Sequence, residues 1–314
     1  MKSLVEIQNS ATQHARSCTL CGNRCSVNRA EDVTICGASQ QMEVSYFGIH
    51  HGEEPPISGK SGCGSFFFHH CGLSCVFCQN WQISNEDSVE PRAMTANELT
   101  YEMLRFQEAG VASIGLVSPT PHITTIAEAL YGARLTGLSV PVVYNSNGFD
   151  SVAGLRLLEG LVDVYLPDMK YASNEPAQVF SGVSNYVDTN RAAVLEMFRQ
   201  AGPTVIGSDG IIRSGLIVRH LVLPGGHSDT VEVLQWIARH LPESVYLSLM
   251  AQYAPAYQVQ SGFFPELACA ITQKQYDFFL EVAQELGIKN ILTQDLKSVN
   301  SYAPDFERVN PFQK

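Results

Sequence analysis

The sequence predicts an α/β fold built on a parallel sheet. From about residue 62 onward, short apolar runs alternate with longer segments of helical periodicity. Each apolar run is bounded by turn residues and is rich in Val, Ile, Leu or Phe, as expected for strands that are buried on both faces. Alternation of this kind implies right-handed crossovers between parallel strands. Six such units make either a doubly wound sheet or an incompletely closed barrel.

The first 61 residues do not follow this alternation. They contain, in order, a helical segment, a cysteine-dense segment, a β-like run and a loop, over Ser3–Arg16, Cys18–Cys36, Met42–Gly48 and Gly52–Gly59. We interpret residues 1–61 as a small, cysteine-rich, metal-binding appendage. Residues 62–314 are then the α/β domain, with a helix and a tail at its C-terminal end.

The predicted strands are the six apolar runs of the α/β region, namely Ser65–His70, Ser113–Val117, Val142–Asn145, Val162–Leu166, Ile217–Leu223 and Val245–Met250. Capping-box spacing marks the start of three of the helices between or after them, because the side chains of the first and fourth residues can bond the free N–H groups there. These pairs are Thr95 with Glu98, Asp229 with Glu232, and Thr272 with Gln275.

Composition and charge exclude several functional classes. The chain has 20 basic and 31 acidic side chains, a net charge of -11, which argues against a nucleic-acid partner. At 45% hydrophobic and 16% charged residues, it has ample material for a large core. The polar N-terminal stretch lacks a secretory signal, and no run reaches the ~18 apolar residues of a membrane span. We therefore expect a cytoplasmic protein that does not bind membranes.

Eight of the nine cysteines lie at or before Cys78, and three of them form the strongest motif of the chain. Cys71, Cys75 and Cys78 have the spacing CX3CX2C, directly after the first predicted strand. Three thiolates can bind three irons of a [4Fe-4S] cluster and leave the fourth iron open to an external ligand. The alternative is a zinc site, for which His69 or His70 would have to supply the fourth ligand.

Polar residues follow the later predicted strands. Because the carboxyl ends of parallel strands meet at one edge, these residues are expected to form one site there, although each alone would be ordinary loop chemistry. They are Ser118–Pro121, Asn145–Gly148, Asp168–Lys170, Arg219 with His220 and Pro224–Gly226, and Gln252–Tyr253.

The cysteine motif and its flanks, Phe66–Cys71 and Cys78–Asn80, resemble the radical S-adenosylmethionine (radical SAM) superfamily. The resemblance is to the group related to pyruvate formate-lyase activating enzymes, among relatives with an N-terminal cysteine segment, and it extends from Cys18 to about Pro255. It implies a partial (β/α)6 TIM-like barrel. It also implies a [4Fe-4S] cluster whose open iron binds SAM. The implied chemistry is that of an oxidoreductase, in which SAM is cleaved to a 5′-deoxyadenosyl radical that abstracts hydrogen from a substrate.

By the same resemblance, the first part of the SAM pocket comes from two segments. Ser118, Pro119 and Thr120 stand where many relatives carry a Gly-Gly-Glu loop whose backbone receives the SAM amino group. Phe77 stands where the family has an aromatic side chain beside the adenine, with core packing as the alternative role.

The remaining implied contacts come from three strand ends. Asn145, Ser146 and Asn147 stand where the activating enzymes have Asp-Thr-Asn, and are expected to contact the ribose or methionine part of SAM. Asp168 and Lys170 match the family's Asp-x-Lys pair, in which Lys approaches the SAM carboxylate and Asp helps to hold a monovalent cation. Arg219 matches an arginine that reaches SAM.

The remaining cysteines form a second set. Cys18, Cys21, Cys25 and Cys36 are four thiols within a short segment, for which either zinc or a second iron–sulfur cluster is expected. Cys63 lies in a Gly-rich loop that could bring it near the site as a thiol hydrogen donor, with a purely structural role as the alternative. Cys269 is expected to be a small buried side chain.

The leading hypothesis is therefore a radical SAM enzyme of unassigned substrate. It would either install a glycyl radical on a partner protein, or modify a small molecule, a peptide or another macromolecule, with flavodoxin or ferredoxin as electron donor. The alternatives are a non-catalytic metal-binding or electron-transfer protein on the same fold, and a zinc-ribbon interaction module with a decayed barrel.

Overall fold

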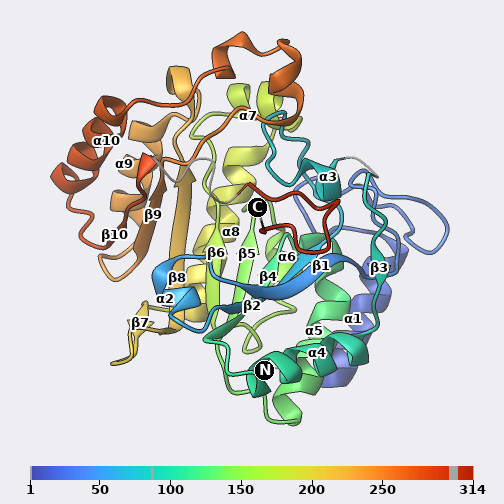
Figure 1. Ribbon diagram of the computed structural model, residues 1–314. Helices are drawn as coiled ribbons and strands as arrows, with labels where there is room; N and C mark the ends of the chain where they lie inside the picture. The colour runs from blue at the N-terminus through green and yellow to red at the C-terminus, as the bar shows by residue number, and fades with distance from the viewer. Residues whose placement is uncertain (1, 86–87, 297–302, 314) are drawn as a thin grey trace.

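The computed structural model describes residues 2–85, 88–296 and 303–313. These residues form a mixed α/β fold around a ten-stranded sheet (Figure 1). The centre of the sheet is parallel and contains the strands that carry the candidate site. These strands are β2 (Cys63–Phe68), β4 (Ser113–Val117), β5 (Val142–Ser146), β6 (Val164–Pro167), β8 (Ile212–Leu221), β9 (Tyr246–Met250) and β10 (Ile291–Leu292).

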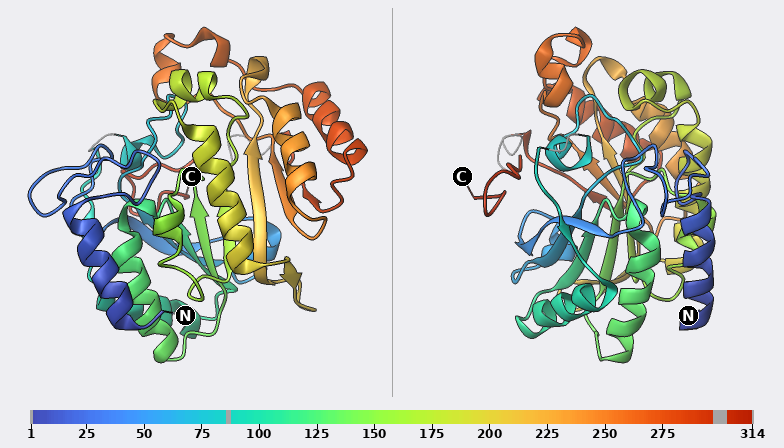
Figure 2. Two further views of the ribbon diagram at one scale, coloured as in Figure 1. Left: turned by 180° about the vertical axis from the view of Figure 1, so that it is seen from behind. Right: turned by 90° about the vertical axis from the view of Figure 1, so that its right-hand side faces the viewer.

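The parallel strands lie side by side in their order along the chain, from β2 to β10. A doubly wound sheet needs a point where the strand order reverses, and this sheet has none along its described path. The doubly wound alternative is therefore wrong. In the left view of Figure 2, the blue, green and yellow helices α1, α5 and α8 cover one face of the sheet.

Short antiparallel strands extend the sheet. β1 (Glu43–His50) pairs with β2, β3 (Arg92–Ala93) pairs with β1, and β7 (Val205–Ile206) pairs with β8. β1 and β2, on either side of the predicted boundary at residue 61, pair in one sheet. Before β1, Ile7, Cys18 and Leu20 pack into the same hydrophobic core as the sheet strands. The division of the chain into two domains stays a prediction.

The helices begin largely where their capping residues predict. The longer helices are α1 (Leu4–Arg16), α4 (Ala96–Glu108), α5 (Ile123–Leu135), α8 (Tyr186–Ala201), α9 (Thr230–His240) and α10 (Gln273–Glu285), and the shorter ones are α2 (Pro55–Ser58), α3 (Trp81–Ser84), α6 (Val152–Leu155) and α7 (Asn174–Ser181). The capping boxes at Thr95 and Thr272 are confirmed. The one expected at Asp229 is wrong, because its carboxylate accepts hydrogen bonds from the N–H and hydroxyl of Ser173 instead.

Strand boundaries differ from the predicted ones mostly by one or two residues. The largest difference is at β8, which begins at Ile212 rather than Ile217, because its first residues pair with β7 outside the parallel core. Among the described residues, none of the helices is long and apolar enough to cross a membrane.

The C-terminal tail, residues 303–313, crosses the face of the sheet opposite the helices (Figures 1 and 2). Its Phe306 and Phe312 rings pack on Phe67 of β2, with centroids 5.6 and 5.3 Å away. The tail thus covers apolar side chains of β2 and β4 that face away from the helices.

Candidate functional site

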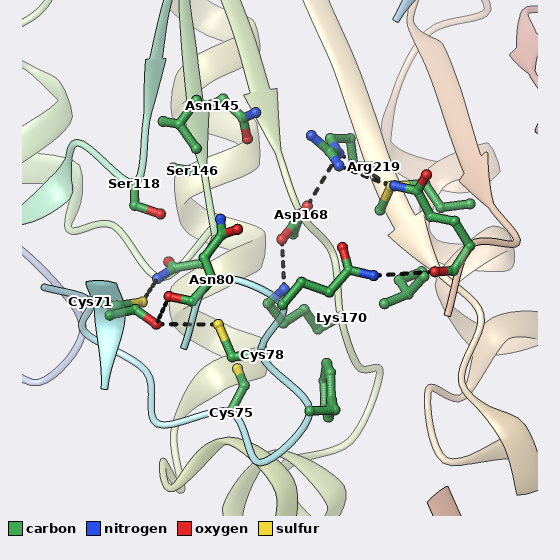
Figure 3. Close-up of a pocket in the computed structure, with 18 residues that line it drawn as sticks. Cys71, Cys75, Cys78, Asn80, Ser118, Asn145, Ser146, Asp168, Lys170 and Arg219 are labelled. Atoms are coloured by element: carbon green, nitrogen blue, oxygen red, sulfur yellow. Dashed lines mark hydrogen bonds and ion pairs between the residues drawn. The ribbon is translucent and has the colours of Figure 1, made fainter. Parts of the chain in front are cut away.

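The predicted strand ends meet around one pocket at the carboxyl edge of the parallel sheet (Figure 3). The pocket encloses about 910 Å³ of empty space, including its open mouth. Its lining includes most of the residues that the sequence singled out, namely Cys71, Cys75, Phe77, Cys78, Ser118, Asn145, Ser146, Asn147, Asp168, Lys170 and Arg219. Pro119 and Thr120 are not among the lining residues.

Each thiol of the CX3CX2C motif lies next to one polar side chain from a different element. The Asn147 amide nitrogen donates to Cys71 Sγ at 3.1 Å. The Ser181 hydroxyl on α7 lies 3.0 Å from Cys75 Sγ, and the Ser84 hydroxyl at the end of α3 lies 3.2 Å from Cys78 Sγ. Sequence reasoning missed both serines, because neither lies at a strand end.

Cys75 is buried and Cys71 and Cys78 are partly buried, and this burial raises the pKa of Cys71 to about 12 and that of Cys78 to about 11. They are therefore neutral at pH 7 unless a bound metal displaces their protons. The two histidines considered as zinc ligands are engaged elsewhere. His70 pairs with Glu43 at 2.9 Å and His69 contacts the Ser45 hydroxyl at 2.8 Å.

The charged wall of the pocket is a connected chain of groups. Lys170 Nζ donates to Asp168 Oδ2 at 2.6 Å, and Arg219 Nε lies 3.6 Å from Asp168 Oδ1 (Figure 3). Glu54, which sequence reasoning did not select, lies 3.6 Å from the same Arg219 nitrogen. Burial, the largest single effect, acts to lower the pKa of Lys170, but the charge and hydrogen bond of Asp168 together with Cys75 and Tyr171 outweigh it, and the pKa lies above its usual value. Lys170 is therefore a cation at all physiological pH values.

Beneath the pocket, a buried carboxylate fixes the loop after β5. Asp150 is 1% exposed and accepts hydrogen bonds from the hydroxyls of Thr120, Tyr144 and Ser146, at 2.7, 2.8 and 2.6 Å. The Thr120 side chain is thus turned towards Asp150, which explains its absence from the pocket wall. Ser118, in contrast, lines the pocket with a left-handed backbone, φ 56°. Of residues 118–120, Ser118 lines the pocket wall, and the predicted backbone contact of this loop to SAM stays a prediction.

The N-terminal cysteine segment lies against this same edge of the fold. Cys21 forms an isolated antiparallel bridge with Asp150, and the Asn23 amide donates to Gly72 O at 2.8 Å. A side-chain carbon on Gly72 would be only 3.4 Å from the Cys21 sulfur. Over residues 2–85, 88–296 and 303–313, no three His, Cys, Asp or Glu side chains are arranged to hold one metal ion. A metal at Cys18, Cys21, Cys25 and Cys36 accordingly stays a prediction.

The two isolated cysteines lie in different surroundings, and only Cys269 departs from its predicted burial. Cys63 is the first residue of β2, wholly buried, and lies at the end of the strand opposite the cysteine motif. Its thiol is not among the residues that line the pocket, and a role as hydrogen donor stays a prediction. Cys269 is exposed rather than buried, because it follows a short turn at the surface.

Comparisons with known proteins give few close matches. No family model matches the chain. It is 29% identical over 281 residues to the uncharacterized protein MJ0674 of Methanocaldococcus jannaschii, covering 87% of this chain and 76% of that protein. Among solved structures it is similar to HydG, a maturase of the [FeFe]-hydrogenase, with TM-score 0.49, 14% identity and 71% of this chain covered. The match spans 49% of HydG, about half its length.

A second similar structure is methylornithine synthase (PylB), with TM-score 0.47 and 14% identity, over 71% of this chain and 68% of that one. None of these similarities is close enough to assign an activity to this chain.

Proposed function

We propose that this pocket belongs to a radical SAM enzyme, with a [4Fe-4S] cluster on Cys71, Cys75 and Cys78 and SAM at the remaining iron. The observation that carries the proposal is the convergence of these three thiols with a polar and cationic wall in one pocket. The donor set fits the group, because three thiols leave one iron free for an external ligand. The side-chain hydrogen bond beside each thiol also fits a cluster, whose sulfurs accept such bonds.

The residues of the pocket would bind and orient the cofactor. Lys170 offers an ammonium for the SAM carboxylate, a charge-assisted contact, and Asp168 holds that ammonium in place. Asn145 and Asn147 offer amides to the ribose or the amino acid part, and the buried ring of Phe77 offers an apolar face for the adenine. When bound, the cluster and SAM together supply one-electron cleavage to methionine and a 5′-deoxyadenosyl radical, and the protein's part is orientation and exclusion of water.

The finer predictions from the resemblance belong to the same proposal. The consecutive order of the parallel strands supports a partial (β/α)6 barrel with a cysteine-rich N-terminal segment. An electron donor such as flavodoxin or ferredoxin is the expected partner. Transfer of the radical to a glycine of a partner protein is one reaction of this class, and zinc or a second cluster is the expected occupant of the N-terminal thiols.

Anaerobic incubation of the iron-loaded protein with SAM and dithionite tests the proposal. We expect 5′-deoxyadenosine to form, and the electron paramagnetic resonance (EPR) spectrum of the reduced cluster to change when SAM is added. The variant Cys75→Ala should abolish both, whereas Cys269→Ala, at the exposed cysteine, should leave both unchanged. A cluster whose spectrum ignores SAM would instead support the electron-transfer alternative.

A further inference from the structure

A second cavity opens beside the proposed SAM pocket. It lies between the loop that follows β1, the ends of β8 and β9, and the segment after β10, and holds about 1000 Å³ of empty space, including its mouth. Arg219 and Gln252 line both cavities, so the second one reaches the same charged wall. A substrate held there would lie next to the SAM pocket without displacing any of the residues assigned to SAM.

The second cavity contains a partly buried carboxylate that lacks a cation of its own. Glu53 lines it, and across the described residues the Glu53 carboxylate has neither a hydrogen bond nor an ion pair. The nearest cation is Arg219, but its guanidinium already lies 3.6 Å from both Glu54 and Asp168. Burial and the charge of Glu54 raise the pKa of Glu53 to about 7, and Arg219 only partly opposes them.

An uncompensated carboxylate of this kind is costly, since transfer of a charge out of water is unfavourable unless a partner is supplied. Besides Arg219 and the exposed His51, the polar side chains of the lining are acidic or neutral, including Glu54, Asp295, Ser248 and Thr293. Among the lining residues that the structure describes, the shared Arg219 is therefore the one Lys or Arg side chain. An anionic ligand would be repelled, whereas a cationic nitrogen group would find a partner in Glu53.

We propose that the second cavity is the substrate site, and that the substrate presents a cationic nitrogen group, a protonated amine or a guanidinium, to Glu53. That the bound molecule is a substrate rests on the function proposed above, whereas the binding of a cationic group beside Glu53 does not. The neutral side chains Ser248, Gln252 and Thr293 would then bind polar atoms on either side of the charged group.

Three small probes of equal length test the charge preference in the full-length, iron-loaded protein. Binding of n-butylammonium, n-butanol and n-butyrate is measured by isothermal titration calorimetry with SAM present. We expect n-butylammonium to bind about tenfold or more tightly than the other two, because only it can pair with Glu53. Equal binding of the alcohol, or no binding of the ammonium up to about 50 mM, the weak limit for a small fragment, would overturn the proposal.

Two variants locate the preference. Glu53→Gln keeps the side-chain shape and removes its charge, so it should abolish the preference for n-butylammonium. Glu281→Gln, at an exposed glutamate on α10, should leave it intact. An unchanged preference in Glu53→Gln would show that another group binds the ammonium. EPR of the same samples with and without SAM reports separately on the proposed function, whatever the binding result.

Discussion

At the scale of single residues, the direction of each hydrogen bond to the three cysteine sulfurs follows from which neighbouring group can donate a hydrogen. The Phe149 N–H donates to Asn147 Oδ1 at 2.8 Å, which turns the Asn147 amide nitrogen towards Cys71 Sγ. Tyr171 and Ser181 hydroxyls lie 2.8 Å apart. A metal-bound Cys75 can only accept, so the Ser181 hydrogen goes to its sulfur and the Tyr171 hydroxyl donates to Ser181. Hydrogen bonds to cluster sulfurs stabilise the more negative, reduced state and raise its potential.

The variant Ser181→Ala should therefore lower the midpoint potential of the cluster. The loss of one hydrogen bond to a charged sulfur, worth ~1 kcal/mol of difference between the two redox states, corresponds to a fall on the order of 50 mV. An anaerobic redox titration followed by EPR measures this shift. Ser139→Ala, an exchange far from the thiols, is the control. A potential that is the same in wild type and Ser181→Ala would show that this hydroxyl does not influence the cluster.

At the scale of elements, the C-terminal tail is linked to the loop that carries Cys78. The Gln82 side chain on α3 accepts from the Phe306 N–H at 2.9 Å and donates to Asp305 at 3.3 Å. Ser84, on the same short helix, contacts Cys78. A helix of four residues has little stability alone, so the tail helps to hold α3 in place beside the pocket.

Truncation of the tail's buried ring tests this link. Phe306→Ala should cost about 3 kcal/mol of unfolding free energy, since Phe306 is buried among aromatic neighbours. Amide hydrogen exchange of residues 82–84 should become faster in this variant. Val309→Ala, at a fully exposed side chain of the same segment, is the matched control and should change neither quantity. Unaltered exchange at α3 in Phe306→Ala would mean that the tail and α3 are independent.

At the scale of the whole molecule, two buried, neutral histidines form hydrogen bonds that join strands and loops from distant parts of the chain. His220 Nδ1 donates to Met169 O at 2.6 Å and its Nε2 contacts the Thr230 hydroxyl at 3.0 Å. His122 Nε2 contacts His69 O at 3.0 Å. Burial lowers the pKa of His220 to about 4 and that of His122 to about 3.

These pKa values predict loss of stability in mild acid. The unfolded histidines bind a proton near pH 6.5, whereas the folded ones do so only near pH 3 to 4. As the pH falls below about 6.5, the unfolded state therefore gains protons first, and the unfolding free energy should fall by about 1 kcal/mol per pH unit for each histidine. Urea denaturation at pH 7.5, 6 and 5 measures this slope.

The variant His220→Gln should have a shallower slope than wild type, whereas His51→Gln, at an exposed histidine, should match wild type. Carboxylates whose pKa the fold lowers, such as Glu196 beside Arg199, lose their stabilising charge in all three proteins alike, so the difference between variants isolates the histidine. Identical slopes in all three would contradict the neutral assignment of His220.

The sequence alone determined the features that depend on neighbouring residues. These features are the strand–helix alternation, the capping boxes at Thr95 and Thr272, and the CX3CX2C spacing. Each involves residues a few positions apart, so it can be predicted from the local sequence. Most of the polar strand ends were also predictable, because parallel strands bring their carboxyl ends to one edge.

Tertiary structure decided the rest, because it depends on contacts between residues far apart in the chain. Ser181 lies 106 residues from Cys75, and no local pattern pairs them. Glu54 lies in a loop that the sequence assigned to the N-terminal segment. Because this loop follows β1, which pairs in the sheet, Glu54 lies next to Arg219. The side-chain direction of Thr120 was likewise decided by a contact with Asp150, 30 residues away in the chain.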